Sequence, residues 1–568
     1  MDTLNINDKW LDHLDEAINY DKSYGPRLGM FLLSLEAWRR GLIVKFYVEK
    51  NKDNKLLIRN EISDGHNTFY FASSRGDKLS QRAMEICENK ALTKKYLKKL
   101  NFDTPVGSLF NANDIDSSIF EYAEKIGYPV VIKPLSSNTG TGVFANIQNR
   151  NELGKALYTL RKTMKHKEIL LEKHFEGSDY RVLVLENEII GIVKRIPANI
   201  VGDGKQTIEE LIKMKNKQRD KNPNLMSRKI KLDDEAIENI KSAGYTISSV
   251  LPKDKVLFLK NKVTLEADVL EANNILNENQ QGLLLEMIKS IEGLHLCGID
   301  IMINEETNQM TIIELNTRPM LGYHMFPYKG EPNDVMSLFI DSYFPDTKNR
   351  EKSNLYFDFH SVIEPLLDMS AEQVILKGIK NKKVIGKSIT FKYVGNPDLS
   401  ALIIYARRNN IHGNIQLINN EYIKLIVGHE DVEKIQEFVE FVKMNTEYES
   451  VEIQAYNKPI KIGFDRIREN KDKIRIKQLK QANKKTQNEL DKFNKKVQDY
   501  VKDIERLEVK NNIEMQRLKK TKRELLLCKE EIQETTTLLE NVYNSKSWKL
   551  TQPLRKISKI ISNKGGKE

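Results

Sequence analysis

The sequence predicts a mixed α+β and α/β body of several domains, followed by a long C-terminal helix. Short β-rich runs fill the first 85 residues, and from Asn89 onward helical and extended segments alternate. Charged heptads fill the region after residue 467. The 568 residues allow about three or four domains. With 40% hydrophobic and 30% charged residues, the composition excludes a collagen-like or wholly disordered chain.

Residues 1–85 are expected to form an N-terminal α/β region. Apolar residues at helical spacing predict a helix over 28–40, with Gly41 at the position of a C-cap. Runs of β-branched and aromatic residues predict three strands, with a turn before the third at Ser63, Asp64 and Gly65. The three strands are predicted over 42–48, 56–62 and 68–71.

Residues 86–345 are expected to form the largest domain, because helical and extended patterns alternate throughout it. The predicted helices cover 91–100 and 207–217, and the predicted strands cover 130–133, 169–172, 181–185, 299–303 and 311–315. We expect residues 346–383 to be a linker and residues 384–465 to form a smaller α/β domain.

Residues 467–545 carry a heptad pattern. Apolar side chains step by four and three residues, and an 11-residue step from Leu507 to Leu518 is similar to a stutter. The pattern favours a coiled coil that makes the protein a homo-oligomer, and the alternative is one long solvated helix. The heptad positions are Phe493, Val497, Tyr500, Ile504, Leu507, Leu525, Cys528, Ile532, Thr535, Leu539 and Val542.

Residues 546–568 form a basic amphipathic tail. Seven basic residues alternate there with apolar ones such as Trp548 and Leu554. That pattern suits an interfacial helix on anionic lipid or a docking segment, and the alternative is a frayed basic end. Residues 543–555 resemble a short tail of bacterial cell-surface glycosyltransferases, which implies a contact with polysaccharide-synthesising machinery.

The net charge of +11 belongs to the C-terminal region. Residues from Ile467 onward hold 27 of the 91 Lys and Arg and 15 of the 80 Asp and Glu, so the rest is nearly neutral. We therefore expect no nucleic-acid partner.

The three cysteines are far apart, and no apolar run spans a bilayer. The polar start is unlike a secretory signal, so we expect a cytoplasmic protein, with the tail allowing a peripheral place at the inner face of the membrane.

A lysine directly after a buried strand gives the strongest local signal. Lys133 ends the run 130–134, and the Gly/Ser/Thr-rich loop 135–143 follows. Glycine lets backbone N–H groups approach phosphate oxygens closely, and the lysine adds a mobile positive charge. A structural hairpin is the alternative.

Two carboxylates and an amide predict a metal site. Asp300 interrupts one apolar run, and Glu314 and Asn316 follow in the next. In an antiparallel hairpin the three side chains share one face, and hard oxygen ligands suit Mg²⁺. The alternative is a solvated polar face.

The whole series resembles the ATP-grasp superfamily over about residues 85–345. Besides the motifs above, it includes the charged segment 172–181, the loop 194–205 before the helix Thr-Ile-x-Glu-Leu-Ile, and Asn-Thr-Arg-Pro at 316–319. The branch of cyanophycin synthetase and bifunctional glutathione synthetase is the most similar. The resemblance implies an ATP-grasp fold and the cofactors ATP and Mg²⁺ or Mn²⁺.

The resemblance also implies roles for single residues. Lys90 and Lys133 would contact phosphates, beneath a closing loop with Ser137, Gly140 and Gly142. The nucleoside would meet Glu172, Lys173, Phe175 and, at the ribose, Asp179. The metal ligands would be Asp300, Glu314 and Asn316. Candidates for holding a substrate carboxylate or the transferring phosphate are Arg181, Lys194, Arg195 and Arg318, with Lys133, Arg181 and Arg318 as the catalytic set.

The implied reaction is an ATP- and Mg²⁺-dependent carboxylate–amine ligation through an acylphosphate. The carboxylate would be a small molecule or part of a polymer, and the amine an amino acid or peptide. The resemblance of the C-terminal tail implies that this ligation belongs to a cell-surface polymer pathway. This chain departs from the branch at residues 261–267, where the branch has an Asn-x-Ser-x-Gly-Gly element, and no Mur-ligase-like second ATP site follows. The substrate therefore stays open.

Residues 384–465 resemble acylphosphatase, which implies a small ferredoxin-like domain. Leu399 and Leu417 fall where an acylphosphatase needs its arginine and asparagine. We therefore expect a non-catalytic module. An acylphosphatase-type hydrolase stays an alternative if Asn396 or Asn414 replaces the missing asparagine. A second alternative is an assembly scaffold that binds ATP without turnover.

Overall fold

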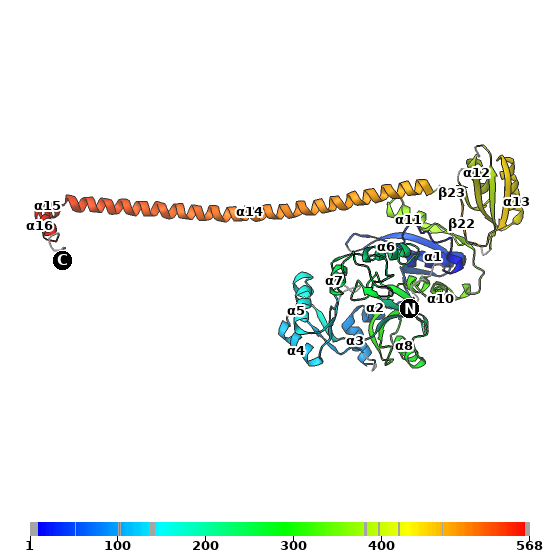
Figure 1. The fold of residues 1–568 in the computed structure, drawn as a ribbon, viewed down its shortest axis with the longest axis horizontal. Helices are drawn as coiled ribbons and strands as arrows, with labels where there is room; N and C mark the ends of the chain where they lie inside the picture. Colours follow the sequence, from blue (N-terminus) through cyan, green and yellow to red (C-terminus); the bar gives the residue numbers. More distant parts are fainter. Residues whose placement is uncertain are drawn as a thin grey trace. The chain divides into compact units, whose positions relative to one another are not determined.

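The computed structural model describes residues 10–51, 53–99, 102, 104–135, 142–379, 383–395, 398–418, 421–467 and 470–562. The chain divides into two compact units, Met1–Ile467 and Arg468–Glu568 (Figure 1). Within the described residues, the first unit contains six sheets, four of which have four or five strands, and the second unit is helical.

An N-terminal sheet packs on helix α1 (Leu28–Arg39). Its strand order is β17-β1-β2-β3-β4. The predicted helix and strands are confirmed, with the ends shifted by at most two residues. The strands are β1 (Ile43–Lys50), β2 (Leu56–Ser63), β3 (Thr68–Ala72), β4 (Arg75–Gly76) and β17 (Gln373–Leu376).

Residues 346–383 do not form the linker that the sequence predicts. Strand β17 pairs antiparallel with β1, and helix α11 (Phe359–Leu367) packs on the same sheet. The reason is apolar burial, since Phe357 and Phe359 are each 2% exposed and contact Phe31 in the core, the first edge-on and the second at a tilt. The N-terminal domain is therefore closed by a segment that lies after the central domain in sequence.

Two sheets make up the central region. The first has the order β5-β8-β6-β7 and is covered by α4 (Asp116–Ile126) and α5 (Arg150–Tyr158); the second has the order β13-β10-β9-β14-β15 and packs on α2, α3 and α8. The strands of the first sheet are β5 (Gly107–Phe110), β6 (Val130–Pro134), β7 (Phe144–Ile147) and β8 (Ile169–Lys173). The second sheet contains β9 (Ser178–Leu185), β10 (Glu188–Ile196), β13 (Asp268–Glu271), β14 (Leu296–Ile303) and β15 (Met310–Asn316), with α2 (Gln81–Glu88), α3 (Lys90–Lys99) and α8 (Glu278–Ser290).

A small subdomain is inserted between β10 and β13. Strands β11 (Asn199–Val201) and β12 (Val256–Phe258) pair, and α6 (Ile208–Arg219) and α7 (Asp234–Ser242) complete a separate core. The predicted helix over 207–217 is confirmed as α6. It begins there because Thr207 and Glu210 form a reciprocal capping box at its N-terminus.

Residues 384–465 fold as a βαββαβ unit with an additional strand. The strand order of its sheet is β21-β18-β20-β19-β23. The ferredoxin-like class of this domain and its likeness to acylphosphatase stay predictions. The elements are β18 (Ile385–Tyr393), α12 (Leu399–Arg408), β19 (His412–Ile418), β20 (Tyr422–His429), α13 (Val432–Met444), β21 (Tyr448–Ala455) and β23 (Phe464–Ile467).

The second unit is one 75-residue helix, α14 (Asn470–Asn544), followed by α15 (Lys546–Leu550) and α16 (Gln552–Ser562) (Figure 1). Heptad side chains are exposed in the single chain, for example Leu518 at 69% and Ile532 at 65%. The coiled coil stays a prediction. Within the described residues, no helix has the length and apolar character needed to cross a bilayer.

Candidate active site

A cavity of about 640 Å³ is lined by both central sheets. Strands β6, β7 and β8 contribute one wall, and β9, β10, β14 and β15 contribute the other. Residues 261–265, which replace the glycine-rich element of the resembling branch, also line it. Of the predicted site residues, the lining contains Lys90, Lys133, Glu172, Lys173, Phe175, Asp179, Arg181, Lys194, Arg195, Asp300, Glu314 and Asn316.

Two lysines pair with one buried glutamate that lines this cavity. Glu172 on β8 accepts from Lys94 Nζ at 2.5 Å, and its other oxygen lies 2.6 Å from Lys133 Nζ on β6. Burial raises the pKa of Glu172, but Lys133 and Lys94 outweigh burial and lower it. Burial also lowers the pKa values of Lys90 and Lys94. An ionised carboxylate at the cavity wall therefore holds two ammonium groups, those of Lys133 and Lys94.

This arrangement adds a residue that the sequence reasoning missed. The Glu172 carboxylate pairs with two lysines, and its expected place at the adenine stays a prediction. Lys94 was not predicted. The available signal was its position four residues after Lys90 on α3, which puts both side chains on one helix face.

The predicted acidic face is confirmed as a hairpin of β14 and β15. Asp300 lies opposite Glu314, and Gly298 lies opposite Asn316, with an irregularity after Asp300. Side chains at positions 314 and 316 share one face because strand residues two apart do so. Lys90 Nζ lies 3.8 Å from Glu314 Oε2, which links the acidic hairpin to the lysines.

Two arginines neutralise Asp300. Arg181 on β9 donates through Nε to Oδ1 and through Nη2 to Oδ2 at 3.0 Å, and Arg195 Nη2 also lies 3.0 Å from Oδ2. Burial raises the pKa of Asp300, but Arg181 and Arg195 outweigh it and lower the pKa. Arg195 Nε also donates to Asp179 at 2.5 Å. Asp179, expected at the ribose, is thus tied to an arginine.

The oxygen atoms of this hairpin fit a magnesium ion whose ligands come partly from the protein and partly from the substrate. Among the described residues, no group of three or more His, Cys, Asp and Glu can hold a metal. Mg²⁺, however, keeps several waters and substrate phosphates and needs only one or two protein carboxylates. Asp300, Glu314 and the Asn316 amide oxygen supply that number. The Asn316 oxygen accepts from the Arg318 N–H at 2.8 Å and keeps a second lone pair.

Two predicted lysines have partners of their own. The Nζ atom of Lys194 on β10 lies 2.5 Å from Glu305 Oε1. Hydrogen bonds from Lys194, Ser178 and Tyr180 lower the pKa of Glu305 to about 2. Lys173 donates to the carbonyls of Gly127 and Tyr128 at 3.1 and 2.8 Å. Its charge therefore fixes the loop before β6, while the residue still lines the cavity.

Part of the predicted phosphate loop lies outside the described residues, including Ser137 and Gly140. Gly142 is described, at φ +74°, and a Cβ there would lie 2.9 Å from Pro134 Cγ. A side chain therefore does not fit. Lys262, which the sequence reasoning did not single out, donates to the Val143 carbonyl at 2.9 Å and joins the loop 261–265 to the end of the glycine loop.

Arg318, predicted to be catalytic, is exposed and is not part of the cavity lining. It follows the end of β15, and partial burial together with the charges of Arg75 and Arg59 lowers its pKa. The adjacent loop is held by the N-terminal domain, because Ser74 donates to the Pro319 carbonyl at 2.7 Å and Arg75 to Thr317 at 2.5 Å. No local sequence pattern indicates these two contacts.

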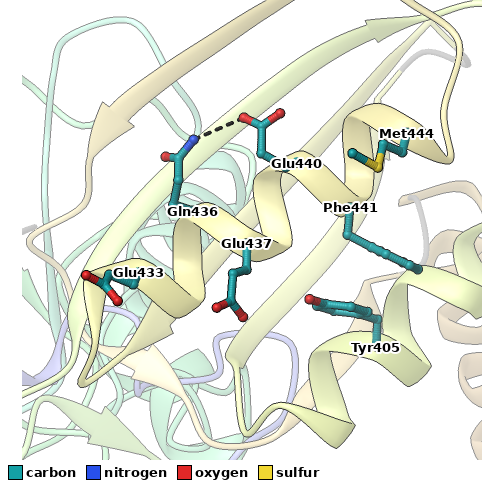
Figure 2. A pocket seen from close by; sticks show the side chains of 7 residues that line it. All are labelled: Tyr405, Glu433, Gln436, Glu437, Glu440, Phe441 and Met444. Atoms are coloured by element: carbon teal, nitrogen blue, oxygen red, sulfur yellow. Dashed lines mark hydrogen bonds between the residues drawn. The ribbon is translucent and has the colours of Figure 1, made fainter.

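Within the described residues, apolar side chains occupy the two positions where the resemblance places the arginine and the asparagine of an acylphosphatase, and Asn396 lies outside these residues. Leu399 is 8% exposed in its core, and Leu417 packs against that core. A separate cavity of about 550 Å³ lies between α12 and α13 (Figure 2). The rings of Tyr405 and Phe441 stack there with their centroids 4.0 Å apart. Its rim carries Glu433, Glu437 and Glu440, whose charges repel a phosphate.

The comparisons agree with this geometry. Residues 108–257 match the family described as D-ala D-ala ligase C-terminus. The expected resemblance to the branch of cyanophycin synthetase and bifunctional glutathione synthetase is confirmed for this region of the chain.

Two curated relatives match the same part of the chain. Cyanophycin synthetase of Synechocystis sp. is 32% identical over 273 residues, which cover 46% of this chain and 31% of the relative. The glutathione biosynthesis bifunctional protein of Pasteurella multocida is 31% identical over 275 residues, which cover 46% and 36%. The chain thus spans about a third of the length of these relatives. The crystal structure of a bifunctional glutathione synthetase from Pasteurella multocida is similar with a TM-score of 0.39 and 27% identity, covering 53% of this chain and 42% of that one.

Proposed function

We propose that this protein is an ATP- and Mg²⁺-dependent ligase that joins a carboxylate to an amine through an acylphosphate. One observation carries the proposal: a single cavity brings lysines from α3 and β6 together with two carboxylates and an amide from the β14–β15 hairpin. Cations for phosphate oxygens and oxygen ligands for Mg²⁺ are the two requirements of phosphoryl transfer.

In the first step a substrate carboxylate oxygen bonds to the γ-phosphorus of ATP, and the bond between that phosphorus and the oxygen of ADP breaks. Lys90 and Lys133 hold phosphate oxygens, while Glu172 keeps the Lys133 ammonium in place. Asp300, Glu314 and Asn316 would hold Mg²⁺, which supplies positive charge against the transferring phosphoryl group.

In the second step the amine nitrogen bonds to the acyl carbon, the bond between that carbon and the phosphate oxygen breaks, and the amine loses a proton. The products are an amide, ADP and inorganic phosphate. Arg181 and Arg195 lie at the same cavity wall, where positive charge favours the leaving phosphate. No side-chain nucleophile is required, since the enzyme contributes position, charge and exclusion of water.

The names of the relatives support amino acids or peptides as substrates. Residues 261–265 line the cavity and differ from the branch, which supports an acceptor of another kind. The basic tail supports a task in cell-surface polymer synthesis near the inner membrane face, and the small domain then serves as a non-catalytic binding module.

The test is ADP release by the full chain with Mg-ATP across a panel of carboxylates and amines, with product masses read in parallel. We expect release that depends on both substrates and a conjugate lighter than their sum by one water, both lost in Glu314→Gln. ATP turnover that needs no amine and yields no conjugate contradicts the ligase. Hydrolysis of an added acylphosphate that persists in Glu314→Gln makes the small domain the active one.

A further inference from the structure

Tyr323 has a buried side chain whose hydroxyl lacks a hydrogen-bond partner in the described part of the chain. The residue lies in α9 (Gly322–Met325), after the acidic hairpin, and lines the cavity. Its side chain is 5% exposed, and the hydroxyl oxygen is not fully enclosed, so the hydroxyl opens on the cavity. A buried phenol usually has a partner for its O–H, and here a ligand can supply one.

Apolar contacts fix the Tyr323 ring beside the arginines of the cavity wall. The ring packs with Val193 on β10 and Val269 on β13. Val193 lies opposite Arg181 on β9, and Val269 lies opposite Arg195 on β10. Residues that lie opposite one another in a sheet share a face, as do residues two apart on one strand. The phenol and both arginines therefore lie on the same face of this sheet.

Arg228 lies over the Tyr323 ring and is not part of the cavity lining. Its Cζ atom is 5.4 Å from the ring centroid, within the range of a cation–π contact. Asn224 Oδ1 accepts from Arg228 Nη1 at 2.8 Å and holds the guanidinium there. Within the described residues Arg228 makes no ion pair. Its positive charge therefore polarises the phenol and makes the hydroxyl a stronger hydrogen-bond donor.

We propose that Tyr323 is a further catalytic residue, whose hydroxyl donates a hydrogen bond to the substrate carboxylate oxygen that does not bond to phosphorus. This inference rests on the proposed function and adds a residue to it. That oxygen stays on the acyl carbon through both steps and gains negative charge when the amine adds to the acylphosphate. The hydrogen bond is then at its strongest, and a donor already in place needs no reorganisation. The hydroxyl keeps its proton throughout.

The position and charge of Tyr323 separate this role from a contact with ATP. In the proposed reaction Lys133 on β6 and Mg²⁺ hold phosphate oxygens, whereas Tyr323 packs on β10 and β13 in the other wall. Arg181 and Arg195 are both tied to Asp300. A neutral donor without a partner suits an oxygen whose charge rises only during the reaction.

The test is ¹⁹F NMR of the full chain labelled with 3-fluorotyrosine, with Mg-AMP-PNP bound in place of ATP. The Tyr323 resonance is the one that Tyr323→Phe removes. The probes are acetate, glutamate and galacturonate, compared with chloride at the same concentration. We expect at least one carboxylate to shift the Tyr323 resonance. The Tyr328 resonance, assigned with Tyr328→Phe, is expected to stay in place, since its hydroxyl lies 3.4 Å from Gln218 Oε1 and the residue does not line the cavity.

Kinetics with a substrate pair that yields a conjugate give a second measurement. Tyr323→Phe keeps the ring and removes only the donor, so we expect kcat to fall about 100-fold and the KM for ATP to change less than about twofold. The matched control, Tyr328→Phe, is expected to change kcat less than about twofold. Arg228→Gln is expected to lower kcat about threefold, and Arg228→Lys, which keeps the charge, to retain most of it.

Three results overturn the proposal. They are a Tyr323 resonance that none of the three carboxylates shifts, an equal shift with chloride, and a kcat of Tyr323→Phe within about threefold of wild type. The NMR measurement needs no turnover, so failure of the ligase assay leaves its result standing. A Tyr323 resonance that does not respond likewise leaves the ligase assay unaffected.

Discussion

Replacing Glu172 by glutamine removes the charge that holds two lysines at the cavity wall. The carboxylate and the Lys133 side chain are 6% and 8% exposed, and the second partner, Lys94, is 20% exposed. Removing one partner of a buried ion pair costs about 3 kcal/mol, because the remaining charge stays buried without a counter-ion. We therefore expect Glu172→Gln to lower the free energy of unfolding by about 3 kcal/mol at pH 7.

The loss of unfolding free energy in Glu172→Gln is expected to depend on pH in a definite direction. Folding lowers the pKa of Glu172, so its contribution is present above the pKa of an unfolded glutamate. The contribution is lost as the pH falls through the lower folded-state pKa. The difference between wild type and Glu172→Gln is therefore expected to be largest at neutral pH and to shrink in acid.

Urea unfolding followed by circular dichroism, repeated from pH 7 to pH 3, measures the effect. Glu85→Gln is the control, since its pair with Arg82 is exposed and should change stability by less than about 0.5 kcal/mol. ATP is expected to stabilise Glu172→Gln more than wild type, because phosphates replace the missing negative charge beside the lysines. Equal stability of variant and wild type at pH 7, or a difference that does not change with pH, refutes the reasoning.

Three further predictions concern other parts of the chain. Asp300→Asn removes one of the two carboxylates assigned to Mg²⁺, so we expect the Mg²⁺ concentration for half-maximal ADP release to rise at least tenfold; an unchanged Mg²⁺ dependence contradicts the assigned ligand. Leu399→Arg is expected to destabilise the small domain by about 3 kcal/mol in thermal unfolding and to create no acylphosphate hydrolysis, since the side chain packs in the core; measurable hydrolysis contradicts this. Ile532→Asp is expected to convert an oligomer to a monomer in sedimentation, whereas a monomeric wild type contradicts the coiled coil.

Local patterns were sufficient for much of the fold and for the acidic face. The β14–β15 hairpin could be predicted because Asp300 and Glu314 interrupt apolar runs whose alternation defines strand faces. The start of α6 could be predicted from its cap residues. Both signals lie within a few residues of what they determine.

Contacts between distant segments could not be predicted in this way. The pairing of Glu172 with Lys94 and Lys133 joins α3, β6 and β8, and nothing near Glu172 in sequence indicates it. Strand β17 is four residues long and completes a sheet formed more than 300 residues earlier. Arg75 likewise holds Thr317 across 242 residues. A single sequence carries no record of these pairings, because they depend on the assembled fold.

The transfer of an ¹⁸O label from carboxylate to phosphate tests the central claim most directly. A carboxylate from the ADP-release panel is labelled at both oxygens and incubated with the full chain, Mg-ATP and the amine. An acylphosphate requires one carboxylate oxygen to leave with the phosphate, so we predict one ¹⁸O in each released phosphate and one in each amide. Released phosphate without ¹⁸O, or label that appears in AMP, contradicts the account.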